Sequence, residues 1–308
     1  MASGPVVVLA GGTGGAKLAR GMLDVAGEDL VVVANTGDDV EAYGGLVSPD
    51  PDLVTFWLAD RIDARGWGLA GDTFAAMAQL RELGEEVWFN LGDRDLAICL
   101  WRAERLAAGA RPTEVADALR RALGVPARVL PMADAPVRTW VRAQGAWHAF
   151  QDFMIRERAA GPVEGVEFRG AAEAAAPPEL LEAIAGAEAV VVGPSNPIIS
   201  IGPILAVPGV REALAATAAP VVAVSPLVGG QVLKGPTDAF LAWAGRPLSA
   251  NGIAAHYGGL LDGLVADERA DWLPTLETDV AMPDADARRR LAAETLAFAR
   301  ALSGGAAG

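Results

Sequence analysis

The chain has 308 residues, of which 52% are hydrophobic and 21% charged, and its formal net charge at pH 7 is −14. This composition is typical of a globular protein with one large or two modest domains, and the acidic balance argues against nucleic acid as a partner, because such binding depends on basic surfaces. No apolar run approaches the ~20 residues that span a bilayer, and the N-terminus lacks the features of a signal peptide, so we expect a cytoplasmic protein without a membrane segment.

The scarcity of cysteine and histidine excludes several kinds of site. Cys99 is the only cysteine and lies in a segment with helical periodicity, which predicts a buried, inert thiol rather than a disulfide or a Cys-rich metal site. His148 and His256 are the only histidines, which argues against a His-based zinc site and against a Ser-His-Asp triad.

A glycine-rich turn follows the first predicted strand. Val6–Ala10 is a β-branched run, Gly11–Gly15 (GGTGG) comes directly after it, and Ala16–Val25 has the spacing of an amphipathic helix. Leu30–Ala34 (LVVVA) is a second buried run, so the order of elements is that of a βαβ unit in a parallel sheet.

The glycine turn matches neither common nucleotide-binding pattern. The P-loop requires a Gly-Lys pair and a following hydroxyl, whereas this chain has Gly15-Ala16-Lys17-Leu18. The dinucleotide pattern requires a third glycine where Lys17 stands, and an acidic residue at the end of the second strand, where Asn35 stands. A tight turn that needs glycine torsions is one interpretation; we favour phosphate contact, because the N-terminus of a helix offers free N–H groups.

Two acidic stretches, NTGDD and SPDPD, come next in the chain. They contain Asp38, Asp39, Asp50 and Asp52. Carboxylates on loops at strand ends suit Mg²⁺, which takes one or two carboxylates together with phosphate oxygens of a substrate. The alternative is turn and capping chemistry, in which Asp52 caps a helix that begins at Leu53. A phosphate-binding turn nearby favours the metal.

The middle of the chain has a different pattern. Helical spacing of apolar residues predicts four helices, with Thr113 as the N-cap of the last, at Asp52–Arg61, Asp72–Leu83, Arg94–Ala108 and Thr113–Leu123. Short strands are predicted after them at Ala127–Leu130, Arg138–Ala143 and Ala146–Phe150. We interpret residues 53–175 as a helical and small-β insertion into a core made of residues 1–52 and 176–308.

Two polar stretches of this middle region have open interpretations. Asn90–Asp95 is a dense polar turn in which Arg94 stands between two aspartates, as a structural ion pair or as an anion clamp. The run Trp147–Phe153 alternates aromatic and polar residues; it is typical of a core unless the ligand is itself an aromatic ring system.

The pattern of a βαβ unit occurs again late in the chain. Ala189–Val192 ends in GPSNP, Val210–Ala216 is a predicted helix, and Val221–Val224 ends in SPLVGG. Continuous Val-rich runs predict strands covered on both faces, so the fold class is α/β, with a doubly wound, mostly parallel Rossmann-like sheet. The carboxyl ends of such strands carry ligand loops, and we expect GGTGG, NTGDD, GPSNP and SPLVGG to meet at one crevice, where the rigid Pro-bracketed pair Ser195-Asn196 can bind a polar ligand.

A series of longer stretches occurs in the order found in one known family. They include VVVLAGGTGGAKLARG, VVVANTGDDVEAYGGLVSPDPDLVTF, RGWGLAGDTF, LGDRDLA, VLPMADAPVRTWV, WHAFQDFMIRER, VVGPSNPIISIGPILAVPGVREAL and VAVSPLVGG. Over about residues 5–268 the chain resembles the 2-phospho-L-lactate transferases of coenzyme F-420 biosynthesis, whose actinobacterial branch uses phosphoenolpyruvate-derived donors.

The resemblance implies a specific transfer reaction. The terminal ribityl hydroxyl of 7,8-didemethyl-8-hydroxy-5-deazariboflavin attacks the phosphorus that bears the lactyl or enolpyruvyl group of a guanylyl-diphospho donor, and GMP leaves. Phosphoryl transfer depends on positioning and charge neutralisation more than on a protein nucleophile, in agreement with the absence of one here. The resemblance also implies Mg²⁺ as cofactor and a homodimer.

The resemblance assigns roles to individual residues. Asp38 is the expected metal ligand, and Asp50 or Asp52 completes the site. The expected acceptor-binding residues are Asp52, Arg94, His148 and Gln151. The expected donor-binding and phosphate-binding residues are Gly11, Gly12, Thr13, Gly14, Gly15, Ser195 and Asn196. SPDPDLVTF departs from the family pattern, which commonly has an aliphatic residue at the position of Pro51 and often Thr at that of Leu53.

A second function from a different class shares the glycine-turn start. It is a nucleotide-sugar-binding regulatory protein of the gluconeogenesis-factor type, which performs no catalysis. The LGDRDLA and HAFQDF blocks favour the transferase. An NAD-dependent dehydrogenase is disfavoured by Lys17 at the third glycine position and by Asn35 at the acidic position.

Overall fold

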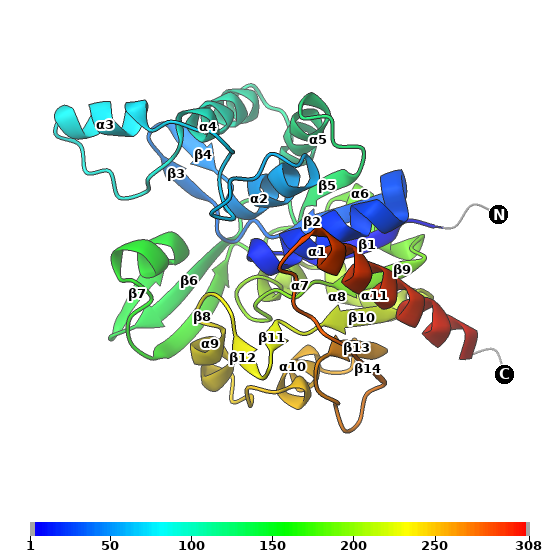
Figure 1. The fold of residues 1–308 in the computed structure, drawn as a ribbon. Coiled ribbons are helices and arrows are strands. Elements are labelled where there is room, and N and C mark those ends of the chain that lie inside the picture. The colour runs from blue at the N-terminus through cyan, green and yellow to red at the C-terminus, as the bar shows by residue number, and fades with distance from the viewer. Residues whose placement is uncertain (1–3, 306–308) are drawn as a thin grey trace.

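The computed structural model describes residues 4–305, and a seven-stranded sheet lies at its centre (Figure 1). All six pairings are parallel, in the strand order β14-β13-β10-β9-β1-β2-β5. The strands are β1 (Val6–Ala10), β2 (Leu30–Ala34), β5 (Arg128–Pro131), β9 (Ala189–Val192), β10 (Val221–Val224), β13 (Gly263–Ala266) and β14 (Thr275–Glu277). This confirms the predicted α/β class and the exact bounds of the four Val-rich strands.

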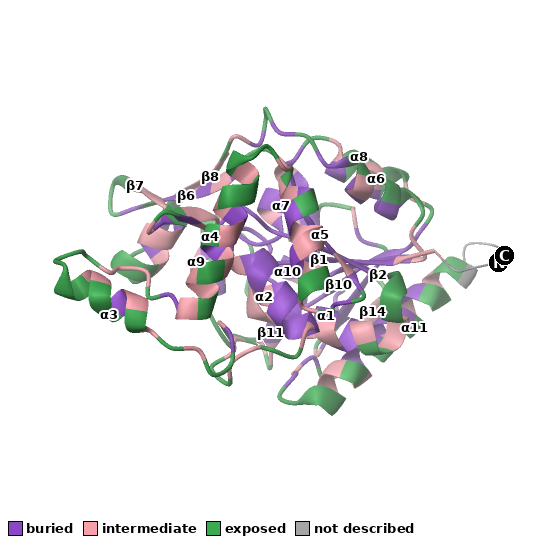
Figure 2. Cartoon of the chain, turned by 90° about the horizontal axis from the view of Figure 1, so that it is seen from above, coloured by how far each residue is buried: buried purple, intermediate pink, exposed green. Residues whose placement is uncertain are grey.

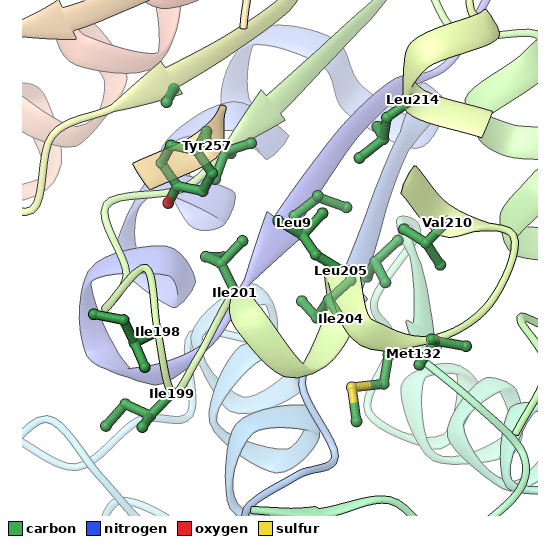
Figure 3. Close-up of a cluster of buried hydrophobic side chains, with 14 of the residues drawn as sticks. Leu9, Met132, Ile198, Ile199, Ile201, Ile204, Leu205, Val210, Leu214 and Tyr257 are labelled. Carbon is green, nitrogen blue, oxygen red and sulfur yellow. The ribbon is translucent and has the colours of Figure 1, made fainter. Parts of the chain in front are cut away.

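Successive side chains of β1 enter two different cores, because side chains of a strand alternate between the faces of a sheet. Val6, Val8 and Ala10 pack on the side of α1 (Gly12–Ala26), α2 (Pro49–Leu58) and α11 (Ala285–Gly305). Val7 and Leu9 pack on the other side, where Figure 3 shows Leu9 beside Ile204 and Leu205. The helices of that layer are α6 (Pro178–Ala185), α7 (Gly202–Ala206), α8 (Val210–Ala216), α9 (Thr237–Trp243) and α10 (Ala250–Tyr257).

The strand order changes direction at β1. From β1 the chain proceeds outward through β2 to β5, and then returns to β9 on the other side of β1 and proceeds to β14. In open α/β sheets the crevice at such a reversal, at the carboxyl ends of the strands, is the usual ligand site. The turns after β1, β2 and β9 therefore surround the position where a ligand is expected.

The middle of the chain supplies a second, antiparallel sheet and several helices. Its strands, in the order β7-β6-β8, are β6 (Arg138–Ala143), β7 (Ala146–Ala149) and β8 (Val163–Arg169), and a π-helical turn spans Asp152–Arg156. A hairpin of β3 (Val40–Ala42) and β4 (Gly45–Val47) precedes α2, and α3 (Ala75–Glu82), α4 (Asp93–Ala107) and α5 (Pro112–Ala122) follow it. Figure 2 shows α3 largely exposed at one end of the molecule, away from the buried central strands.

One strand of the predicted insertion lies in the central sheet. Ala127–Leu130 was expected in the small-β part of residues 53–175, but β5 pairs in parallel with β2, from Val31–Arg128 to Ala34–Pro131. Its apolar residues Val129 and Leu130 enter opposite cores of the central sheet. The expectation is wrong for this strand, because a short apolar run does not show which sheet its partner belongs to.

Three helices begin earlier than their apolar spacing predicts. Helix α1 begins at Gly12 instead of Ala16, so that the glycine turn forms its first turn, with Gly11 as N-cap. Helix α2 begins at Pro49, with Ser48 as N-cap, so the alternative in which Asp52 caps a helix that begins at Leu53 is wrong. Helix α5 begins at Pro112 with Arg111 as N-cap, so Thr113 is not the cap. Proline is favoured in the first turn because it donates no backbone hydrogen bond there.

Two further sequence expectations concern individual segments. The Cys99 thiol is buried, as predicted, and burial raises its pKa to about 12, which disfavours the reactive thiolate. Within residues 4–305, every helix is too short or too polar to cross a bilayer.

Candidate functional site

A buried hydrogen-bond network joins the turns after β1 and β2 to the start of α2. Asp50 accepts hydrogen bonds from the Gly12 backbone N–H (2.7 Å) through Oδ1 and from Asn35 Nδ2 (2.9 Å) through Oδ2. The Asn35 Oδ1 in turn accepts a hydrogen bond from the Gly37 N–H (2.7 Å). The network therefore fixes NTGDD and SPDPD against the N-terminus of α1, as the prediction of a single crevice requires.

The turn after β9 packs directly against the glycine turn. Ser195 Oγ accepts a hydrogen bond from the Gly11 N–H (3.2 Å). A Cβ atom at Gly14 would lie 2.1 Å from the Pro194 carbonyl oxygen, and one at Gly15 would lie 2.6 Å from Ser195 Oγ. These glycines are required because the two turns approach too closely for side chains. As at the start of any α-helix, the first backbone N–H groups of α1 have no intrahelical acceptors.

Asp38 and Asp50 are adjacent buried carboxylates. Asp38 is 8% exposed, its Oδ1 has no hydrogen-bond partner among the described residues, and burial, followed by the charge of Asp50, raises its pKa well above the usual range. Burial also raises the pKa of Asp50 to about 6, although the Gly12 N–H and Asn35 oppose the shift. Two desolvated carboxylates side by side are costly unless a proton or a cation neutralises them.

This pair fits a cation of the Mg²⁺ type. No cluster of three or more His, Cys, Asp or Glu residues suited to a metal ion occurs within residues 4–305. Mg²⁺ usually takes one or two carboxylates and completes its six positions with water and substrate phosphate oxygens. The unpartnered Oδ1 of Asp38, beside Asp50, is chemically suited to that arrangement.

Asp52, the third residue of the predicted metal set, is held elsewhere. Its Oδ1 accepts a hydrogen bond from Arg102 Nη2 in an ion pair in which both residues are buried, with Asp52 8% and Arg102 6% exposed. Arg102 also donates to the Leu46 carbonyl (2.7 Å). The geometry favours Asp50 over Asp52 as the partner of Asp38.

A cavity of about 380 Å³ adjoins Asp52. Its walls come from the NTGDD turn, β4, α2, α4, α5 and the segment after β5. Polar groups are contributed by Thr36, Asp39, Glu41, Ser48, Asp52, Thr55, Arg102, Asp134 and Arg138, and apolar ones include Leu106, Val115, Leu119 and Pro136. Ligand sites of this size commonly combine apolar walls with a few fixed polar groups.

The other predicted acceptor residues do not line this cavity. Gln151 Nε2 donates to the Asp38 backbone carbonyl (3.1 Å), so the structure brings it to the acidic turn. His148 lies on β7, opposite Val141. Arg94 is exposed, and its guanidinium donates to the Ala70 carbonyl (3.2 Å). The roles of His148 and Arg94 remain predictions.

The Asn90–Asp95 turn has a structural explanation. Asp72 accepts the backbone N–H groups of Arg94 and Asp95 at the start of α4, and Asp93 accepts those of Ala75 and Ala76 at the start of α3. Acidic side chains at helix N-termini satisfy N–H groups that lack intrahelical acceptors. The two helices thus cap each other, and Arg94 makes no ion pair within residues 4–305.

Sequence reasoning missed Asn35 and Arg102 as site residues. Asn35 directly follows β2, so its position at a strand end was the available signal. Arg102 lies in the periodic pattern of α4, 50 residues from Asp52, and no local signal marks it. Asn196, in contrast, was predicted to face the donor, but its Oδ1 accepts the backbone N–H groups of Ile198 and Ile199 and so is used within its own turn.

The buried carboxylates give a pH prediction for the metal-free protein. The pKa values of Asp39 and Asp50 are raised by burial to about 7 and about 6, so the folded state binds more protons than the unfolded state between pH 4 and 7. Stability should therefore fall as the pH rises through that window. In calorimetry with EDTA, we expect Tm to be several degrees lower at pH 8 than at pH 5.5, and Asp50→Asn to reduce this difference; an unchanged pH slope in Asp50→Asn would contradict the assignment.

The sequence is similar to that of one family of transferases over most of its length. A family model described as 2-phospho-L-lactate transferase CofD matches residues 6–295. The 2-phospho-L-lactate transferase of Methanosarcina mazei is 42% identical over 267 residues, 86% of this chain and 87% of that protein. The phosphoenolpyruvate transferase of Kitasatospora aureofaciens is 44% identical over 272 residues, 85% and 84% of the two chains.

A solved structure supports the fold. The crystal structure of a member of the UPF0052 family from Bacillus halodurans superimposes with a TM-score of 0.64, over 96% of this chain and 99% of that chain. The two sequences are 18% identical, so the comparison concerns the architecture alone.

Proposed function

The chain belongs to the 2-phospho-L-lactate transferase family and is a transferase, and from this premise we propose that it makes the phosphodiester of coenzyme F-420 biosynthesis. In the donor, a single diphosphate bridge joins guanosine to the lactyl or enolpyruvyl group, so that one phosphate belongs to GMP and the other to the three-carbon group. The acceptor is 7,8-didemethyl-8-hydroxy-5-deazariboflavin. The acceptor hydroxyl forms a new P–O bond, the P–O bond to GMP breaks, and the hydroxyl proton is released.

The observation that carries this proposal is the Asp38–Asp50 pair at the N-terminus of α1. Phosphoryl transfer requires charge neutralisation and in-line positioning, and this position combines both. The free N–H groups of Thr13 and Gly14 at the start of α1 donate to phosphate oxygens, as helix N-termini commonly do. Asp50 holds that helix start in place through the Gly12 N–H.

Mg²⁺ would be held by Asp38 and Asp50. When bound, the ion neutralises charge on the donor diphosphate. Asn35 keeps Asp50 oriented from the opposite side, with 2.9 Å between Asn35 Nδ2 and Asp50 Oδ2. Gln151 holds the Asp38 backbone from the second sheet, so the acidic turn is fixed from two directions.

We propose that the cavity next to Asp52 binds the ring system of the acceptor. Its wall on the α5 side is largely apolar, which suits the faces of a ring system, and its polar groups on the other side suit the carbonyl and hydroxyl groups of that ring. Thr36 and Asp39 line the cavity and belong to the same turn as Asp38. A ring bound there places its ribityl chain toward the acidic pair.

Mass spectrometry of reaction products tests this function. The protein is mixed with the deazaflavin, Mg²⁺, GTP, a guanylyltransferase that forms the donor in situ, and one three-carbon phosphate at a time. We expect a phosphodiester of the deazaflavin together with GMP for 2-phospho-L-lactate or phosphoenolpyruvate, and no product in EDTA. Tight UDP-sugar binding without any deazaflavin product would instead support the regulatory alternative.

The proposal includes a homodimer in the cytoplasm. We infer the dimer from the family resemblance and the cytoplasmic location from the sequence, which has no features of a signal peptide. Light scattering coupled to size-exclusion chromatography measures the mass against the 31.7 kDa of one chain.

A further inference from the structure

Buried polar atoms without hydrogen-bond partners gather at the turn that follows β2. Within residues 4–305, six buried side-chain polar atoms lack a partner, and three of them belong to Thr36, Asp38 and Thr139. Thr36 and Asp38 flank Gly37 in the sequence, and Thr139 contacts Gly37 from the second sheet. Because an unpaired buried polar group is costly, native structures retain few of them. Three such atoms around one glycine therefore indicate a place where the hydrogen bonding serves a ligand.

The backbone of β6 holds Thr139 against this turn. Thr139 is the second residue of β6, and its backbone N–H donates to the Gly37 carbonyl (2.8 Å). It lies opposite Phe168 of β8 and is 1% exposed. Since backbone atoms make the contact with Gly37, the place of residue 139 beside the turn does not depend on its side chain.

The hydroxyl of Thr139 lies close over Gly37. A Cβ atom at Gly37 would lie 2.5 Å from Thr139 Oγ1 and 2.9 Å from Asn35 Oδ1. Gly37 does not have a positive φ, so the close approach of these two oxygens, and not its torsion, requires glycine there. The hydroxyl and the amide oxygen of Asn35 thus lie beside the same point.

Asn35 connects this point to the acidic pair. Its Oδ1 accepts the Gly37 N–H (2.7 Å), and its Nδ2 donates to Asp50 (2.9 Å). An amide oxygen has two lone pairs, and among the described residues Asn35 Oδ1 accepts only that one hydrogen bond. It can therefore accept a second one, and the Thr139 hydroxyl is the unused donor beside it.

A hydroxyl that is merely enclosed by a core is the alternative interpretation, and Thr295 is an example of it. Thr295 lies on α11 next to the core residue Leu296, is 0% exposed, and also has an unpartnered Oγ1. Thr139 differs because an amide oxygen and the unpartnered Asp38 Oδ1 belong to the turn that it contacts. This difference favours a role in the site.

We propose that Thr139 is a positioning residue for the acidic pair. In the loaded site its hydroxyl donates to Asn35 Oδ1, which fixes the amide that orients Asp50 and the turn that carries Asp38. A small tightening of the turn suffices, because the two oxygens already lie beside the same point. This inference rests on the proposed function, since it assigns the role to a site that binds Mg²⁺ and the donor diphosphate.

Titration of the metal-free protein with Mn²⁺ tests the proposal without turnover. Mn²⁺ shares the preference of Mg²⁺ for oxygen ligands, and electron paramagnetic resonance measures the free ion. Thr139→Val should weaken Mn²⁺ binding about tenfold, which corresponds to about 1.4 kcal/mol and is within the usual contribution of one hydrogen bond. Thr139→Ser keeps the hydroxyl and should retain an affinity within about twofold of the wild type.

The stability of the metal-free variants should change in the opposite direction. Thr139→Val removes an unpartnered buried hydroxyl and keeps a similar shape, so its Tm in EDTA should equal or exceed that of the wild type. Thr295→Val is the matched control, because it removes the same kind of hydroxyl from α11; its Tm should behave in the same way, and its Mn²⁺ affinity should be unchanged.

Three results would overturn the inference: wild-type Mn²⁺ affinity in Thr139→Val, an equal loss in Thr139→Ser, or a metal-free Tm of Thr139→Val several degrees below that of the wild type. The first of these in a protein that makes the phosphodiester would leave the proposed function standing. Weakened Mn²⁺ binding in Thr139→Val, with rescue by Thr139→Ser, in a protein that yields no phosphodiester with any donor would support the positioning role and contradict the proposed function.

Discussion

Asp38→Asn should lose turnover by on the order of 10³-fold while the protein remains folded. The substitution preserves shape but removes one of two carboxylates that would neutralise a cation on the donor phosphates, and losing one preorganised electrostatic group costs about 10²–10³-fold in rate. Folding should not suffer, since Oδ1 of Asp38 has no partner among the described residues and burial disfavours its charge. Tm at pH 8 should equal or exceed that of the wild type.

Single-turnover rates, together with Mg²⁺ affinity by calorimetry, measure this effect. Glu173→Gln is the control, because it removes an exposed carboxylate from the turn after β8. Weaker Mg²⁺ binding together with the rate loss would support a metal role for Asp38. Full activity of Asp38→Asn at limiting Mg²⁺ would contradict it.

The central sheet could be predicted from the sequence because its signals are local. Each Val-rich run is buried on both faces, and the glycine and proline turns that end these runs mark their carboxyl ends. That rule predicts that Asp38, Ser195 and the start of α1 lie at one edge of the sheet. Helix starts were less predictable, because apolar spacing reports the buried face of a helix and not its first turn.

Long-range pairing could not be predicted. Nothing near Arg102 in the sequence indicates that its guanidinium reaches Asp52. That ion pair shows that the two aspartates of SPDPD have different partners, because Asp52 pairs with Arg102 and Asp50 accepts the Gly12 N–H. Similarly, Lys17 resembles a misplaced P-loop lysine in sequence. Its actual contacts are Met282, 265 residues away, and the ring of Trp57. Such contacts depend on tertiary packing, which a single sequence does not report.

Arg102→Met should destabilise the protein by about 3–5 kcal/mol, which is the usual cost of leaving one member of a buried ion pair uncompensated. The side chain of Asp52 would remain buried, with its strongest cationic partner removed. The Leu46 carbonyl would also lose its hydrogen bond from Arg102. Urea unfolding at pH 7.5, with Arg120→Met as a control in the more exposed Asp117 pair on α5, measures the difference.

Adding Asp52→Asn to Arg102→Met should recover a large part of that loss, because the uncompensated charge is then removed. Recovery of stability without recovery of deazaflavin binding would show that the ion pair keeps Asp52 charged and oriented toward the cavity, rather than merely holding α2 and α4 together. If the double variant were as unstable as Arg102→Met, the loss would come from packing and from the Leu46 carbonyl instead. Because each substitution leaves the Asp38–Asp50 pair intact, Mg²⁺ affinity should remain at the wild-type level in both variants, which separates the acceptor side of the site from the metal side.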